Sequence, residues 1–453
     1  MSKPLNIANW FRGSFSHGIH PPENKHFTAA APIRRLPFPE QLVLPLSMHI
    51  GKPSVSLVRK GQEVARGEPI ARADGFVSVP LHAPASGVIS DIRLMPTARG
   101  PRTLSLILDV YPGDPQEVLY GAPVDVAAMT PDEIVAAVQH TGLVGLGGAG
   151  FPTHVKMKVP DDCDIDTVLI NGCECEPFLT TDHRLMLEQA ADLVEGTRIL
   201  MRAMGARQGI IATEDNKLDA VAAIQAVLKP KDHVRAVAVE TKYPQGAEKM
   251  LIKSVLNREV PGGQFPSAIG VGVFNVATTA QMGQLMPMQR GVIERVVTVT
   301  GPGVQLPGNY LVPIGTPIRW LLAQCGFEGG ARHLIMGGPM MGGTVSSLDV
   351  PITKGCGGLL VLREHQLTSE AQMQRYPCIS CGACVDACPM HLNPCELGRL
   401  AYKGQYEPMA ESYHLNDCFE CGSCSYVCPA AIPLVQYFRI AKSSNRERVA
   451  KAS

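Results

Sequence analysis

The spacing of apolar residues changes along the chain and divides it into stretches of different structure. Short apolar runs broken by Gly and Pro predict a small β-barrel or sandwich. Farther along, strands alternate with amphipathic helices, which predicts a mostly parallel, doubly wound sheet. We therefore expect a multidomain α/β protein with an N-terminal arm at 1–30, a barrel at 31–112, an α/β domain at 125–285, a small β-rich module at 286–348 and a helical domain at 365–453.

The α/β stretch gives the clearest local signals. Thr130 can cap a helix that begins at Pro131, and acidic residues follow in its first turn. Strands are predicted at 167–170, 209–212 and 235–239, and helices at 181–203, 217–228 and 246–257. In the β-rich module we expect a strand at 292–300 and a short helix at 316–325.

The barrel stretch resembles the lipoyl and biotinyl carrier fold, because K-G-Q-E-V-x-x-G-E-P-I at 60–70 is followed by A-P-x-S-G-V-I at 83–89. A working carrier needs a modifiable Lys at the tip of its central hairpin. Here that turn reads Ala73-Asp74-Gly75. We therefore expect a barrel-sandwich scaffold without a swinging arm.

Composition narrows the class of function. The 41 basic residues balance the 41 acidic ones, and aromatic residues make up 5%, which argues against a nucleic-acid partner. No apolar run approaches the roughly 18 residues of a membrane span, and the N-terminus lacks the apolar core of a signal peptide. Fourteen Cys in such a chain favour metal ligation in a reducing compartment over disulfides.

Eight of these cysteines form two copies of one motif. Each copy reads C-x2-C-x2-C-x3-C-P, the spacing with which bacterial-type ferredoxins hold iron–sulfur clusters. The fourth Cys of each run reaches the other cluster. One [4Fe-4S] cluster is therefore assigned to Cys378, Cys381, Cys384 and Cys428, and the other to Cys418, Cys421, Cys424 and Cys388. Disulfides or structural zinc are the alternative, which the duplicated spacing disfavours.

A glycine-rich loop precedes the first predicted strand of the α/β domain. Gly145, Gly147, Gly148 and Gly150 let backbone N–H groups approach an anion such as a phosphate. Phe-Pro follows where a Rossmann helix would continue, and the Gly-Lys-Ser/Thr of a P-loop is missing. Lys156 is a candidate for capping a phosphate or a cofactor carbonyl, and a solvated lysine is the alternative.

A polar cluster follows the predicted strand at 167–170. Open α/β sheets bind ligands beyond the carboxyl ends of their strands. Asn171 can donate to and accept from a flavin ring or ribityl chain, and Glu174 and Glu176 can bind ribose hydroxyls. The Cys173 and Cys175 pair lacks the further ligands that a metal site needs.

Together these segments carry a family resemblance. Two segments resemble the flavin- and NADH-binding subunit of respiratory complex I. They are the glycine-rich loop, G-x-G-G-A-G-F-P-T with its Lys, and the segment from Asn171, N-x-x-E-x-E-P. The whole chain, from about 13 to 440, resembles still more closely the C subunit of the Rnf complex, an ion-translocating oxidoreductase of bacteria. Further matching segments are 18–25, 171–185, 243–249 and the paired ferredoxin motifs.

The resemblance implies four modules: a barrel-sandwich hybrid, a complex-I-like FMN domain, a β-grasp module of the SLBB type and a helical ferredoxin-type domain with two [4Fe-4S] clusters. It implies non-covalent FMN held by the glycine loop, Lys156 and Asn171. It further implies that Phe151 and Glu176 contact NADH, that Glu248 belongs to the site although Ala247 replaces the preceding family Glu, and that Asn275 is a second flavin contact. Cys173 departs from the family Asp, which puts that flavin contact in doubt.

The implied function is electron input. As a flavin-containing NADH dehydrogenase-type subunit, the chain would move electrons between NADH and a ferredoxin-linked chain at the cytoplasmic face of the inner membrane, while membrane-embedded and ferredoxin-like partner subunits couple this to cation transport. No residue is assigned an acid–base or nucleophilic catalytic role. One alternative is a flavin-free, ferredoxin-like adaptor. Another, a relative of the A subunit of sodium-pumping NADH:quinone reductases, is disfavoured by the cluster motifs. The transported ion, the direction of electron flow and the cluster that faces FMN stay open.

Overall fold

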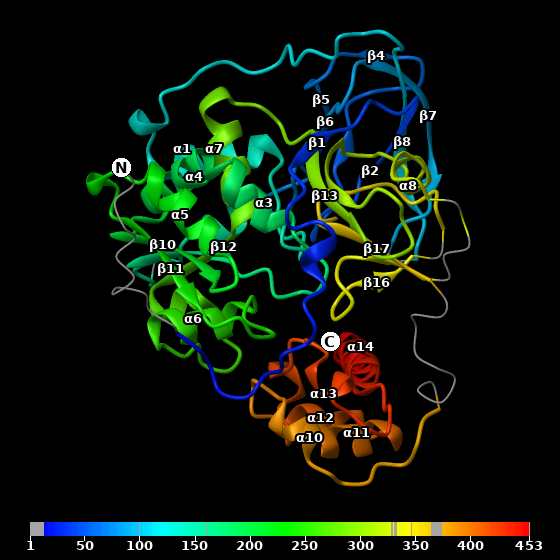
Figure 1. Cartoon of the computed structure of the whole chain (residues 1–453). Helices are drawn as coiled ribbons and strands as arrows, with labels where there is room; N and C mark the ends of the chain where they lie inside the picture. Colours follow the sequence, from blue (N-terminus) through cyan, green and yellow to red (C-terminus); the bar gives the residue numbers. More distant parts are fainter. Residues whose placement is uncertain are drawn as a thin grey trace.

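The computed structural model describes residues 13–98, 100–160, 162–327, 329, 333–345, 347–363 and 374–452 (Figure 1). No helix in these ranges is both long and apolar enough to pass through a membrane. Short 3-10 helices connect the larger elements: η2 (Lys25–Phe27), η3 (Val126–Ala128), η4 (Pro230–Asp232), η5 (Pro266–Ile269), η6 (Met286–Met288) and η8 (Leu415–Asp417).

Two small antiparallel sheets form the barrel-sandwich hybrid. One has the order β2 (Gln41–Pro45), β8 (Thr103–Val110), β7 (Gly87–Met95) and β4 (Glu63–Val64), and the other has the order β3 (Val55–Ser56), β5 (Pro69–Arg72) and β6 (Leu81–His82). Short strands suffice here because fully buried Leu42, Ile70 and Leu106 fill the space between the sheets. The barrel-sandwich prediction is confirmed.

The hairpin that carries the lipoyl group in carrier proteins is docked onto the α/β domain. Gln139 Nε2 donates hydrogen bonds to the carbonyls of Gly75 (3.2 Å) and Ser78 (3.1 Å). The His154 ring lies with Nε2 2.6 Å from the carbonyl oxygen of Phe76 and meets the Phe76 ring edge to face. The tip is thus a fixed contact between domains, as expected of a scaffold.

The α/β domain contains a four-stranded parallel sheet with the order β11 (Val234–Val239), β10 (Gln208–Glu214), β9 (Thr167–Gly172) and β12 (Val271–Asn275). Its helices are α1 (Pro131–Thr141), α2 (Thr153–Met157), α3 (Thr181–Glu188), α4 (Ala190–Met204), α5 (Leu218–Val227), α6 (Glu248–Leu256) and α7 (Val276–Leu285). The predicted start of α1 is confirmed by a capping box between Thr130 and Glu133. The single helix expected at 181–203 is two helices that break at Gln189.

Helices cover both faces of this sheet, as in a doubly wound fold (Figure 1). Leu251 and Ile252 of α6 pack against Leu169 and Val273 on one face, while α4 and α7 cover the other. α4 and α7 approach closely because Gly196 lacks a side chain: a Cβ there would lie 1.8 Å from the carbonyl oxygen of Thr279. β12 and α7 were not predicted from the sequence.

The third body is a mixed six-stranded sheet with the order β1 (Ile33–Arg35), β14 (Gly308–Pro313), β13 (Glu294–Thr300), β17 (Gly358–Leu362), β15 (His333–Met336) and β16 (Gly343–Thr344). Helix α8 (Ile318–Gln324) packs on it through Leu321 and Leu322. β1 falls in the stretch expected to begin the barrel, but pairs in parallel with β14. β17 lies beyond residue 348 and pairs with β13 and β15.

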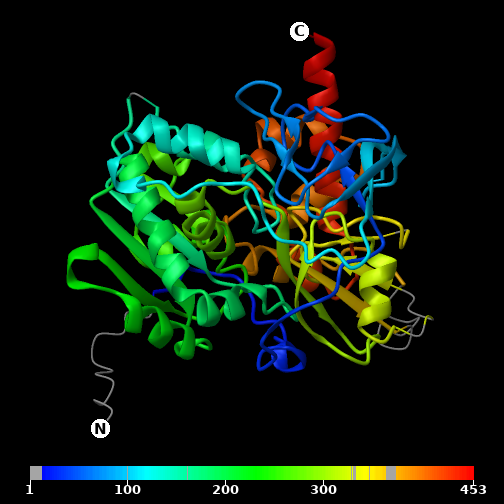
Figure 2. The same ribbon diagram turned by 90° about the horizontal axis from the view of Figure 1, so that it is seen from above.

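The C-terminal body is helical: α10 (Ala383–Asp386), α11 (Pro394–Tyr402), α12 (Tyr406–Glu411), α13 (Ser423–Tyr426) and α14 (Leu434–Ala452). Its core contains Leu397, Met409, Leu415 and Phe438, all nearly inaccessible to solvent. It sits at one end of the molecule in Figure 1, and Figure 2 shows α14 projecting from it with the C-terminus. Residues 364–373, which precede this body, lie outside the described ranges.

Candidate functional site

The candidate site begins where the sheet of the α/β domain changes direction. From β9 the chain adds β10 and β11 on one side and later returns to place β12 on the other. Ligands of open α/β sheets bind at such a switch point, beyond the carboxyl ends of the strands. Asn171 at the end of β9 and Asn275 at the end of β12 are register partners across it.

Both asparagines hold neighbouring segments in place. Asn171 donates through Nδ2 to the carbonyl of Gly246 (2.7 Å) and accepts the N–H of Cys173 through Oδ1 (3.0 Å). Asn275 is the N-cap of α7 and donates through Nδ2 to Oδ2 of Asp182 (2.7 Å). Each amide is therefore fixed in orientation by contacts within the chain.

The glycine-rich loop lies beside this switch point and is held by hydrogen bonds within the loop, to α7 and from the barrel. The N–H of Gly145 donates to the carbonyl of Phe151 (2.8 Å), and that of Leu146 donates to Oγ1 of Thr278 at the start of α7 (2.9 Å). From the barrel, the N–H of Ile50 donates to the carbonyl of Gly150 (2.9 Å). The loop is thus preorganised by the α/β domain and the barrel together.

Gly148 is the point at which the loop backbone opens most clearly to the site. Its φ of 108° is strained for any residue with a side chain, and a Cβ there would meet no atom within 4 Å. The backbone at this position therefore faces open space, as expected of a surface that an anionic ligand approaches closely.

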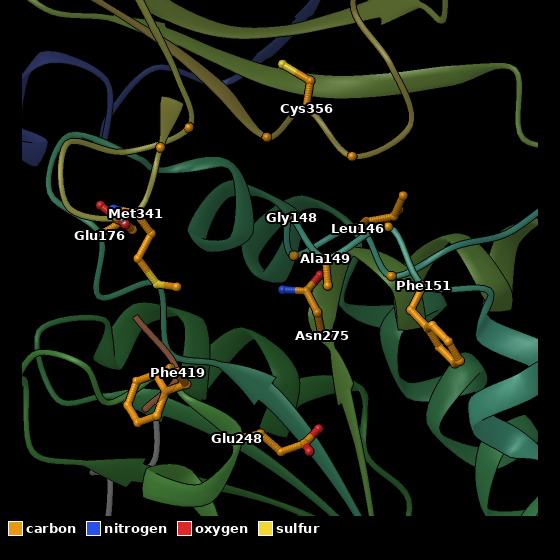
Figure 3. A pocket seen from close by; sticks show the side chains of 18 of the residues that line it. Leu146, Gly148, Ala149, Phe151, Glu176, Glu248, Asn275, Met341, Cys356 and Phe419 are labelled. Atoms are coloured by element: carbon orange, nitrogen blue, oxygen red, sulfur yellow. Dashed lines mark hydrogen bonds between the residues drawn. The ribbon is translucent and has the colours of Figure 1, made fainter. Parts of the chain in front are cut away.

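A cavity of about 1410 Å³ joins these features (Figure 3). Every sequence-predicted flavin and NADH residue lines it: Gly145, Gly147, Gly148, Gly150, Phe151, Lys156, Asn171, Glu174, Glu176, Glu248 and Asn275. Segments of the barrel, the β-rich body and the helical body complete the lining. The sequence therefore predicted residues that the fold brings to a single cavity.

Lys156 and Glu248 form an ion pair at this cavity, between Nζ of the lysine and Oε2 of the glutamate. Lys156 Nζ also lies 5.7 Å from the ring centroid of Phe274. Since about a third of each side chain is exposed, the pair adds little to stability and the ammonium can turn to an anionic ligand.

The two glutamates expected to bind ribose both accept backbone hydrogen bonds. Glu174 is buried and accepts the N–H groups of Asp182 (3.0 Å) and His183 (3.2 Å) at the start of α3. Glu176 accepts those of Met340 (3.0 Å) and Met341 (2.7 Å). Glu174 thus caps a helix, whereas Glu176 fastens a loop of the β-rich body to the cavity.

Asp182 lines the cavity but was not singled out from the sequence. Burial, with the negative charge of Glu174 nearby, raises its pKa to about 7. Its place at the start of α3, within the 171–185 segment that carries the family resemblance, was the available signal. Its contact with Asn275 could not be predicted, because β12, the strand that ends at Asn275, was not predicted from the sequence.

The sequence assigns the cysteine motifs to two sets of four, which we name by position. The outer set is Cys378, Cys381, Cys384 and Cys428, and the inner set is Cys418, Cys421, Cys424 and Cys388. Burial raises the pKa of Cys424, and the neighbouring thiols of Cys421, Cys418, Cys388 and Cys384 raise it further. Burial likewise raises the pKa of Cys384 to about 11, with Cys428 among the neighbouring thiols that contribute. Thiols of both sets therefore lie near one another, and the assignment of the fourth cysteine of each run to the other set stays a prediction.

The composition of each set suits an iron–sulfur cluster. Within the described ranges, no three His, Cys, Asp or Glu side chains are grouped closely enough to hold a single metal ion. Four thiols per set, with no other ligand type, fit a [4Fe-4S] cluster.

The inner set adjoins the cavity, and the outer set faces solvent. Cys418 and Phe419 line the cavity. The Tyr243 hydroxyl, which also lines it, donates to the carbonyl of Cys421 (2.5 Å). Cys378 and Cys381 of the outer set are exposed.

Four family descriptions match consecutive parts of the chain. They are the RnfC barrel sandwich hybrid domain at residues 13–110, the Nuo51 FMN-binding domain at 138–284, the SLBB domain at 296–343 and the 4Fe-4S dicluster domain at 377–432. Together they account for all four predicted modules, and the fold class is confirmed.

Curated relatives match over nearly the full chain. The C subunit of the Na(+)-translocating ferredoxin:NAD(+) oxidoreductase complex of Acetobacterium woodii is 41% identical, over 97% of this chain and 98% of that protein. The C subunit of the proton-translocating ferredoxin:NAD(+) oxidoreductase complex of Clostridium ljungdahlii is 40% identical, over 96% and 94%. The C subunit of the ion-translocating oxidoreductase complex of Edwardsiella ictaluri is 41% identical, over 95% of this chain and 54% of that longer protein.

A solved structure shares the fold at low identity. A chain of the NAD+-reducing [NiFe]-hydrogenase in the H2-reduced state aligns with a TM-score of 0.51 and 19% identity, covering 73% of this chain and 68% of that chain. The full-length relatives carry the assignment: the chain belongs to the family of C subunits of ion-translocating Rnf oxidoreductase complexes.

Proposed function

We propose that the cavity binds FMN and a nicotinamide nucleotide, and that the chain moves electrons between NADH and a ferredoxin-linked chain as a subunit of an ion-translocating complex. The observation that carries this proposal is that one cavity is lined by the glycine loop, by the switch-point asparagines and by Cys418 of the inner set. Flavin and iron–sulfur chemistry thus have adjoining sites in one chain.

Different residues of the cavity bind the phosphate and the flavin ring of FMN. Backbone N–H groups of the loop around Gly148 receive the phosphate, and the Lys156 ammonium adds positive charge. Asn171 and Asn275 orient the flavin. Bound FMN supplies the exchange between a two-electron hydride and single electrons.

The nicotinamide nucleotide contacts Phe151, Glu176 and Glu248, which line the cavity. Figure 3 shows Glu176 and Met341 at one wall and Phe151 toward the opposite one. Because Glu176 fastens the 340–341 loop through two hydrogen bonds, it shapes its wall as well as offering negative charge there.

The positions of the two cysteine sets suggest the order in which electrons pass through the clusters. The inner set adjoins the cavity, so it exchanges electrons with the flavin. The outer set exchanges them with a partner, because Cys378 and Cys381 are exposed. Apolar Ile379 is 68% exposed between these two cysteines, and Tyr402 is 83% exposed on the same body. Such exposed apolar groups favour docking of another iron–sulfur subunit.

We further propose that partner subunits hold the chain at the cytoplasmic face of the membrane.

The domain limits predicted from the sequence are retained with two extensions, since β1 and β17 complete the sheet of the β-rich module.

The decisive experiment is anaerobic purification followed by cofactor analysis and addition of NADH. We expect one FMN and eight irons per chain, and rapid reduction of flavin and clusters. Eight irons without flavin, and clusters that stay oxidised with NADH, would establish the adaptor alternative instead. Flavin reduction without cluster reduction would refute the proposed contact between cavity and inner set.

A further inference from the structure

Cys395 belongs to neither cysteine set, yet it touches one of them. Its Sγ atom lies 3.8 Å from Sγ of Cys378 in the outer set. Cys395 is the second residue of α11 and is half-buried, so the rigid start of a helix holds the thiol in place. Cys378 also accepts the backbone N–H of Ser380 (3.4 Å).

The direction of this hydrogen bond follows from the assignment of Cys378 as a cluster ligand, and so rests on the proposed function. A ligand cysteine is a thiolate without a proton. Only Cys395 can then donate, through its S–H group, to the Cys378 sulfur. Hydrogen bonds to cluster sulfurs stabilise the more negative, reduced cluster and so raise its potential.

The second motif supplies an internal comparison. The two halves repeat at an interval of 40 residues, from Cys378 to Cys418 and from Cys388 to Cys428. The backbone N–H two residues after the first cysteine, that of Ser380 or Glu420, bonds to the cysteine sulfur in both halves. The position equivalent to Cys395 is Val435, which is buried in the apolar core and has no proton to donate.

We propose that Cys395 is a positioning residue that tunes the outer cluster. Its thiol raises the potential of that cluster and so favours an electron on the cluster nearest the surface. The two halves share the backbone contact, whereas the thiol is present only beside the outer set. Cys395 therefore gives the outer set a side-chain donor of its own, just as the Ser423 hydroxyl, 3.4 Å from Sγ of Cys421, gives one to the inner set, where the outer set has Ala383.

The test is a potentiometric titration of the purified chain followed by electron paramagnetic resonance. In Cys395→Ala we expect the ratio of reduced to oxidised outer cluster at a fixed potential to fall about three- to tenfold, tenfold being about 59 mV for a one-electron couple. Cys395→Ser keeps a donor at the same place and should restore most of the wild-type ratio. A Cys381→Ser variant alters the signal of the outer cluster and so identifies it.

Val435→Ala is the matched control, because it truncates the equivalent side chain of the other half. It should leave the outer-cluster titration unchanged. An unchanged potential in Cys395→Ala, or equal shifts in the Ala and Ser variants, would overturn the proposal. Loss of four irons in Cys395→Ala would overturn it in favour of direct ligation. A wild-type chain without clusters would instead refute the proposed function itself.

Discussion

The phenolic hydroxyl of Tyr243 donates a 2.5 Å hydrogen bond to the backbone carbonyl of Cys421. Tyr243 belongs to the α/β domain and is 1% exposed, while Cys421 belongs to the inner set. The bond therefore joins the wall of the flavin cavity directly to the backbone of a cluster ligand. Gly422 supports the same approach, since a Cβ there would lie 3.1 Å from the carbonyl oxygen of Met340.

Replacing Tyr243 by Phe should loosen this junction while keeping the ring. The Cys421 carbonyl would lose its partner in a buried place, at a cost of roughly 1–3 kcal/mol. We expect NADH to reduce the flavin at a normal rate and the clusters to follow severalfold more slowly, as measured by stopped-flow absorbance. Tyr310→Phe removes a similar bond, to the carbonyl of Leu306 (2.6 Å), at a place that adjoins Cys325 but neither cysteine set, and should leave both phases unchanged. Equal cluster rates in both variants would contradict the prediction.

Gly148→Ala should reduce flavin content. The new methyl group would project into the cavity from a backbone with φ of 108°. Gly113→Ala is the matched control, because Gly113 has φ of 75° and open space around it but lies away from the cavity. We expect at least a tenfold weaker FMN affinity, about 1.4 kcal/mol, for Gly148→Ala alone, measured by flavin fluorescence. Equal flavin content in the two variants would refute the placement of the flavin.

Glu176→Gln and Glu174→Gln should have different effects, although the residues are two apart. Glu176 accepts the backbone N–H groups of Met340 and Met341 at the cavity. The amide in Glu176→Gln keeps only one acceptor oxygen for these two bonds, so we expect a higher KM for NADH with the flavin retained. Glu174 caps α3, so Glu174→Gln should chiefly cost stability, on the order of 1 kcal/mol. Steady-state kinetics and thermal melting separate the two. A raised KM in Glu174→Gln, with none in Glu176→Gln, would reverse the assignment.

Much of this site was predictable, and the missing parts have physical reasons. The glycine loop and the cysteine runs are local motifs whose spacing carries their chemistry. Asn275 was expected only from the resemblance, because β12 is short and was not recognised as a strand, so its pairing with Asn171 stayed hidden. The break at Gln189 interrupts a helix without Gly or Pro. β1 joined the third sheet through long-range pairing that no local pattern encodes.

His82 should make the chain sensitive to acid. Burial lowers its pKa from the ordinary 6.5 to about 3, with the positive charge of Lys354 contributing. Between pH 6.5 and 3 the unfolded chain binds a proton that the folded chain does not, so stability falls as pH falls. At pH 5 the loss is about 2 kcal/mol. His82→Phe should reduce the drop in thermal midpoint between about pH 7.5 and 5, followed by circular dichroism. An undiminished drop would show that other groups dominate acid unfolding.

Lys156→Met should weaken flavin binding by an amount that depends on salt. The Lys156 ammonium is shared with Glu248 and is able to turn toward a phosphate in the cavity. Removing its charge should lower FMN affinity about tenfold at low ionic strength and less at high, because salt screens a partly exposed charge. Lys158→Met is the control, since Lys158 pairs with Asp132 at an exposed place outside the cavity lining. The measurement is FMN titration of the apoprotein at two salt concentrations. If Lys156→Met and Lys158→Met bind FMN alike, or if the loss is the same at both salt concentrations, the ammonium does not act on the phosphate by charge.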